Sequence, residues 1–228
     1  MKRGSMFRKL GGHSRQPQAA FTLIELLTVM TIIVILAGLV LAGVSYAQKK
    51  AALSRAQGEI SALSTALESY KTDNGDYPRS KPSGSALGNG LEANKLDPRT
   101  QGNPANYKDA SLALYAALSG DLPLNGSAGY TDTGTNTKYK VYMEFSPNML
   151  YPKGIGQGTN PSVQYLQDPF GNPYGYSTAQ NYQIQQGTPS PPNQGYNPTF
   201  DLWSTSGETT NPSPGKAGDI TLKWIKNW

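Results

Sequence analysis

The stretch that decides the fold is FTLIELLTVMTIIVILAGLVLAGV, residues 21–44. Glu25 is its only charged residue, and the 19 residues from Leu26 to Val44 carry no charge. As an α-helix, such a segment spans about 28 Å, close to the roughly 30 Å of hydrocarbon in a bilayer. The alternative is a buried helix of a soluble protein, but soluble helices of this length keep a polar face. We therefore predict a transmembrane helix half over residues 21–45.

The segment before the apolar stretch is short and basic. Residues 1–20 contain five Lys or Arg and no acid, so the chain from Phe21 onward is formally neutral. The positive-inside rule places such a leader in the cytoplasm and the rest of the chain outside. An ordinary secretory signal is cut after its apolar region, whereas here the small residues Ala19 and Ala20 precede it. Cutting there would leave the anchor on the mature protein, so we expect residues 1–20 to be a cleaved leader peptide.

The sequence QAAFTLIELL, residues 18–27, resembles the class III signal peptide of type IV pilins and type II secretion pseudopilins. The resemblance implies that a prepilin peptidase cuts between Ala20 and Phe21 and methylates the new amine of Phe21. Most members of these families carry Gly where this chain has Ala20, a departure that the families tolerate. The resemblance also implies that the subunit assembles with copies of itself into a filament.

Glu25 needs a partner, because a carboxylate is costly in hydrocarbon. Cleavage would create a cation at Phe21, which lies four residues earlier and could pair with Glu25 within one helix. In the family this carboxylate is thought to neutralise the amine of a neighbouring subunit, which implies an assembly salt bridge. A Glu that only reaches the membrane surface is the remaining alternative.

After the apolar stretch the pattern becomes amphipathic, which predicts a second helix half over residues 46–73. No Pro occurs from residue 21 to residue 77. The helix should end at DNGDYP, where Gly75 suits a left-handed cap and Pro78 prevents continuation. Small and apolar residues recur at helical spacing: Ala47, Ala51, Ala52, Ala56, Ile60, Leu63, Leu67 and Tyr70.

Residues 74–228 are predicted to form a periplasmic domain of mixed structure. Residues 108–119 should be a short helix, packed through Leu112, Tyr115, Ala116 and Leu118. Alternating apolar and polar residues indicate strands at 137–145, 172–177, 200–204 and 219–224, and residues 178–199 are expected to be a long loop. The fold class is therefore α+β and pilin-like, a long N-terminal helix packed on a small antiparallel sheet with long loops.

The segment DPFGNPYGY, residues 168–176, resembles the DPWGNPY-type segment of the major type II secretion pseudopilin. Its Pro, Gly and Asn residues predict successive turns that deliver Tyr174 and Tyr176 to the sheet. The last part of the chain resembles that family's ending, where a loop binds calcium, so the resemblance implies Glu208 and Asp219 as calcium ligands. A Pro/Gly loop with Asp219 as a turn residue is the alternative. The resemblance covers residues 11–78 and 166–228, and we see none between them.

Composition argues against several other functions. The net charge of +5 comes from the leader, which argues against a nucleic-acid surface. There is no cysteine, and the only histidine, His13, lies in the leader. A mature protein without either residue has no Ser-His-Asp triad and no Cys-His pair. Asp73 and Asp76 flank the predicted helix end and are poor candidates for a catalytic pair, so we expect no enzyme.

The preferred interpretation is a subunit of a type II secretion pseudopilus, anchored in the bacterial inner membrane with its C-terminal domain in the periplasm. Its expected partners are copies of itself, prepilin peptidase, minor pseudopilins and the inner-membrane assembly platform. One alternative is a type IV pilus subunit for adhesion or DNA uptake. The other is a membrane-anchored binding domain that never polymerises.

Overall fold

The structure is a computed structural model that describes residues 21–82, 90–153, 155, 162–187, 194–208 and 221–228, with only the backbone of Ala42. The chain divides into two compact units, residues 1–47 and residues 48–228. Ala20 and Asp219 lie outside the described residues.

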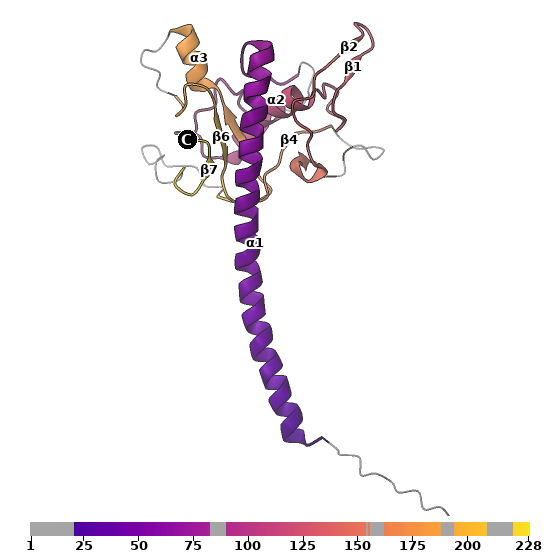
Figure 1. The fold of residues 1–228 in the computed structure, drawn as a ribbon. Helices are drawn as coiled ribbons and strands as arrows, with labels where there is room; N and C mark the ends of the chain where they lie inside the picture. Colours follow the sequence, from indigo (N-terminus) through magenta and orange to yellow (C-terminus); the bar gives the residue numbers. More distant parts are fainter. Residues whose placement is uncertain (1–20, 83–89, 154, 156–161, 188–193, 209–220) are drawn as a thin grey trace, which may run out of the picture. The chain divides into compact units, whose positions relative to one another are not determined.

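Helix α1 runs over Leu23–Asn74 without interruption (Figure 1). It confirms the predicted long helix to within two residues at each end. Gly75 follows with a φ of 80°, and its N–H donates to the carbonyl of Lys71 at 2.7 Å. A residue with a Cβ is strained at this positive φ, so glycine allows the helix to end here.

The second half of α1 contributes one face to the core of the second unit. Ile60, Leu63 and Leu67 are buried together with α2, which spans Lys108–Ser119 after the short 3-10 helix η1, Pro104–Tyr107. The bounds of α2 match the sequence prediction, and the four side chains predicted to pack it are buried. Burial extends around most of α2, which makes it the central helix of the unit.

Three small antiparallel sheets replace the single predicted sheet. Their strand orders are β1-β2, β3-β4 and β5-β6-β7. The bounds are Thr131–Asp132 for β1, Thr137–Lys138 for β2, Leu150–Tyr151 for β3, Tyr165–Leu166 for β4, Gly175–Ser177 for β5, Asp201–Ser204 for β6 and Ile225–Lys226 for β7. The 3-10 helix η2 occupies Pro147–Met149. In the third sheet, Tyr176 is paired with Leu202, and Trp203 with Lys226.

The strand predicted at 137–145 is wrong beyond Lys138. The backbone N–H groups of Tyr142 and Met143 both donate to the carbonyl of Leu118, at 2.8 and 3.1 Å. This part of the chain therefore completes the C-terminal end of α2 and does not join a sheet. The last predicted strand lies later than expected, because residues 221–224 form a turn in which the N–H of Trp224 donates to the carbonyl of Thr221 at 3.2 Å.

The long loop predicted at 178–199 contains a helix, α3, which spans Ala179–Gln186. The guanidinium of Arg79, which lies outside this segment, donates hydrogen bonds to the side-chain oxygens of Asn181 at 3.0 Å and Gln185 at 2.8 Å. These two residues are four apart and lie on one face of a helix. A contact with a distant part of the chain thus stabilises a helix for which the local sequence has no apolar pattern.

Asp168 organises the turn that the DPFGNPYGY segment predicted. Its carboxylate accepts from the N–H of Phe170 at 2.9 Å, from the N–H of Asn172 at 2.8 Å and from the hydroxyl of Ser204 at 2.6 Å. Tyr174 and Tyr176 are fully buried, so the turn does deliver them to the core.

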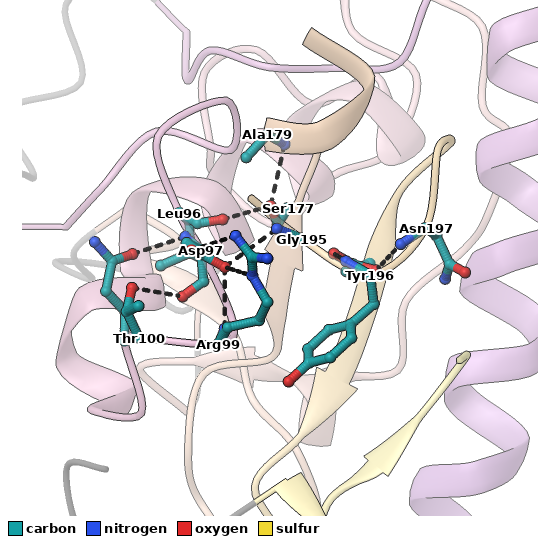
Figure 2. Close-up of polar contacts among 11 residues, drawn as sticks. Leu96, Asp97, Arg99, Thr100, Ser177, Ala179, Gly195, Tyr196 and Asn197 are labelled. Carbon is teal, nitrogen blue, oxygen red and sulfur yellow. Dashed lines mark hydrogen bonds and ion pairs between the residues drawn. The ribbon is translucent and has the colours of Figure 1, made fainter. Parts of the chain in front are cut away.

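Two further buried carboxylates hold the loop before β6 (Figure 2). Asp97 accepts from the N–H of Gly195 at 3.1 Å, and Asp201 accepts from the N–H groups of Tyr196 and Asn197, both at 2.9 Å. Arg99 forms an ion pair with Asp97 at 3.1 Å. Three consecutive backbone donors are satisfied in this way, as a buried loop requires.

Candidate functional site: the N-terminal assembly segment

The N-terminal end of α1 is closed by a reciprocal cap between Thr22 and Glu25. The Thr22 hydroxyl accepts from the N–H of Glu25 at 3.3 Å. One carboxylate oxygen, Oε2 of Glu25, accepts from both the N–H and the hydroxyl of Thr22, each at 2.8 Å. This is a capping box, which satisfies donors that the first helical turn leaves free. The T-x-x-E spacing is visible in the sequence, but the sequence analysis above did not use it.

The cap also defines how much of Glu25 is available to a partner. Its other oxygen, Oε1, accepts no hydrogen bond within the part of the chain that the structure describes. The side chain of Phe21 is 88% exposed. The carboxylate is therefore held in place by its own helix and retains one oxygen for a second donor.

The helix that follows presents apolar side chains on all sides. From Phe21 to Leu41 every residue is exposed. α1 is the one described helix that is long and apolar enough to cross a membrane, by length and composition. Its most exposed large apolar side chains include Leu23, Ile24, Val34, Leu39, Val40 and Leu41. Such a surface is far larger than the apolar patches that soluble monomers expose, so it requires lipid or other helices to cover it.

The predicted calcium ligands are only partly described. The carboxylate of Glu208 pairs with the ammonium of Lys223 at 3.2 Å. Among the described residues, no group of three or more His, Cys, Asp or Glu gathers as a metal site. Of the two predicted calcium ligands, the structure therefore describes Glu208 alone, the last described residue before the segment that contains Asp219.

Asp73 and Asp76 each have a cationic partner. Asp73 pairs with Lys140, whose ammonium lowers the pKa of this carboxyl by hydrogen bonding to it. Asp76 pairs with Arg79 at 2.8 Å. Both carboxylates take part in contacts that tie the end of α1 to other parts of the domain.

Comparison with known families shows which class of protein this chain is similar to. The prokaryotic N-terminal methylation motif matches residues 15–41, and the family "Type II secretion system (T2SS), protein G" matches residues 44–144. A methylation motif followed directly by a match to this family is the arrangement of type IV pilin-like proteins of the pseudopilin class, and the chain is similar to them. Within that class the match is to protein G, which confirms the resemblance inferred from the sequence.

The similar curated proteins are all named "Type II secretion system core protein G". The relative from Pseudomonas aeruginosa is 38% identical over 99 residues, which cover 43% of this chain and 65% of the relative. The relative from Aeromonas hydrophila is 35% identical over 95 residues, 42% and 62% of the two chains, and that from Escherichia coli K12 is 38% identical over 90 residues, 40% and 57%. The chain thus spans less than two thirds of each of these relatives. No solved structure matches.

The comparisons also correct one statement of the sequence analysis. The protein G domain continues to residue 144, so the view that residues 79–165 show no family resemblance was wrong for most of that range. Turn-rich stretches hid the similarity, because their composition is less specific than that of the helix. The similarity inferred for residues 166–228 lies beyond the domain match and stays a prediction.

Proposed function

We propose that this chain is a structural subunit of a type II secretion pseudopilus, which assembles through α1 and is not an enzyme. The observation that carries the proposal is the carboxylate of Glu25, which the capping box holds while one oxygen remains available. The protein G domain over residues 44–144 favours a pseudopilus over a type IV pilus.

In this proposal, cleavage between Ala20 and Phe21 produces a cationic amine beside an exposed apolar helix. Assembly brings that amine to the free oxygen of Glu25 on a neighbouring copy. A subunit at the wrong axial offset would leave two charges unpaired in an apolar environment, which is strongly unfavourable. The pairing therefore selects one register. Prepilin peptidase, minor pseudopilins and an inner-membrane assembly platform are the further partners, with the domain after α1 in the periplasm.

The test compares Glu25→Ala with Glu92→Ala, the same substitution at a surface residue paired with Lys95 at 2.9 Å. We expect both variants to insert and to be cleaved, and only Glu25→Ala to be missing from sheared filaments. Normal filament yield from Glu25→Ala would refute the pairing role. Mass spectrometry of the mature protein should show methylated Phe21 as the first residue; a chain that still begins at Met1 would contradict the whole assembly scheme and favour a non-polymerising anchor.

We further propose that calcium binds the loop between β6 and β7 through Glu208 and Asp219. Hard cations prefer carboxylate oxygens, often from one loop. The pair of Glu208 with Lys223 is largely exposed, 40% and 70% for the two side chains, and an exposed ammonium is readily displaced by a divalent cation. Millimolar calcium should raise the melting temperature of the full chain in detergent, and Asp219→Ala should abolish this shift. An unchanged melting temperature of the native chain would exclude the site.

A further inference from the structure

The first charges after the membrane segment are two consecutive lysines. No charged residue occurs from Leu26 to Gln48, a stretch of 23 residues, and Lys49 and Lys50 follow at once. In a helix those 23 residues rise about 35 Å, compared with roughly 30 Å of hydrocarbon and about 40–45 Å with the headgroups included. A chain that spans the bilayer through this stretch therefore brings both ammonium groups to the headgroup layer.

Among the residues that the structure describes, neither lysine has a partner. Both are exposed, and neither takes part in an ion pair or hydrogen bond with any described residue. The next cation of the helix differs, because Arg55 pairs with Glu59 at 2.7 Å. Two adjacent positions on a helix are about 100° apart, so the two ammonium groups reach different sides of α1.

Tyr46, three residues before Lys49, suits the same environment. Tyr46 is 71% exposed, and Tyr is enriched at membrane interfaces because its ring is apolar and its hydroxyl is polar. Residues 46–50 all belong to helix α1, so the lysines follow the apolar stretch without an intervening loop.

From these observations we propose that Lys49 and Lys50 bind the phosphate groups of acidic phospholipids in the leaflet at the C-terminal end of the membrane segment. This proposal rests on the membrane anchoring proposed above and adds a lipid preference to it. An ammonium near an anionic membrane surface is attracted to it by about 1 kcal/mol, so two of them should enrich acidic lipid around the helix several-fold.

The full chain would be reconstituted in vesicles of phosphatidylcholine with a trace of spin-labelled phosphatidylglycerol or spin-labelled phosphatidylcholine. Electron paramagnetic resonance then measures the relative association of the two probes with the protein. We expect a several-fold preference for phosphatidylglycerol, reduced to near one in Lys49→Gln/Lys50→Gln and at 0.5 M salt. The matched control is Lys138→Gln/Lys153→Gln, which makes the same charge change at exposed lysines outside α1 and should keep the preference.

An equal association of both probes with the native chain would overturn the proposal. A preference for phosphatidylglycerol that survives in Lys49→Gln/Lys50→Gln would also overturn it. If that variant keeps the lipid preference and loses only self-association, the lysines contact a second copy of the chain and the proposal is wrong. If alkaline carbonate extracts the chain from the vesicles, the membrane anchor itself is refuted. If the chain stays inserted but shows no lipid preference, only the lysine proposal fails.

Discussion

The hydroxyl of Tyr174 donates a hydrogen bond to the carboxylate of Glu59, 115 residues earlier in the chain. Tyr174 is fully buried at the end of the Asp168 turn, whereas Glu59 lies on α1 and also pairs with Arg55. This contact connects the C-terminal part of the domain to α1, the helix proposed to build the filament. Burial, together with the hydrogen bond to this carboxylate, raises the pKa of the Tyr174 hydroxyl.

Tyr174→Phe should therefore destabilise the domain by about 1–2 kcal/mol, because it removes a hydrogen bond to a charged group and leaves Glu59 with one partner fewer. Urea unfolding of the full chain in detergent measures the change. Tyr151→Phe is the matched control, since Tyr151 is 39% exposed, stacks its ring on Tyr165, and its hydroxyl makes no hydrogen bond to any described residue. Its effect should stay within about 0.5 kcal/mol, and equal effects of the two variants would contradict the importance of the Glu59 contact.

Gly175 and Gly58 should respond in opposite directions to the same substitution. A Cβ at Gly175 would lie 2.0 Å from the buried indole of Trp203, whereas a Cβ at Gly58 would meet nothing within 4 Å. Gly175→Ala should cost about 2 kcal/mol or more through overpacking. Gly58→Ala, within α1, should stabilise by about 0.5–1 kcal/mol through helix propensity. Thermal unfolding of the two variants tests this, and a neutral Gly175→Ala would mean that Trp203 has room to move.

Asp201 should make stability depend on pH. Burial raises the pKa of this carboxyl from 3.8 to about 6, against the lowering effect of its two backbone donors. A raised pKa means that the folded chain binds the proton more tightly than the unfolded chain. The stabilisation is therefore complete below about pH 4 and is lost as the pH rises through about 6, and it amounts to at most about 3 kcal/mol.

Asp201→Asn isolates that contribution. The unfolding free energy of the variant should change less between pH 4 and pH 6.5 than that of the native chain. Asp132→Asn is a suitable comparison, because hydrogen bonds from Gly134 and Thr135 lower the pKa of Asp132, and its removal should not flatten the profile in this direction. Parallel profiles for Asp201→Asn and the native chain would show that Asp201 does not titrate in this range.

Helices α1 and α2 were predictable because the signals that set them are local. Gly75 and Pro78 end the first helix, and Gly120, with a φ of 65°, ends the second by donating its N–H to the carbonyl of Ala116 at 3.0 Å. The apolar stretch at residues 21–44 was predictable for the same reason. A carboxylate within an apolar run indicates a functional role by composition alone.

The strands and α3 were not predictable from local pattern. The stretch 137–145 alternates as a strand does, yet Leu118 of α2 takes the backbone donors of Tyr142 and Met143. A polar stretch read as loop becomes helix α3 because Arg79 holds Asn181 and Gln185 from another part of the chain. In both cases the partner that decides the backbone conformation is distant in sequence.

The sequence by itself determined the apolar helix, its charge at Glu25 and its resemblance to pseudopilins, because hydrophobicity and helix-ending residues act within a few positions of one another. The tertiary structure alone decided that the C-terminal half forms three small sheets and that Asp97, Asp168 and Asp201 fix loops by accepting hydrogen bonds from their backbone. Those choices depend on which buried backbone groups find a donor or acceptor, and that is settled only when distant segments pack together.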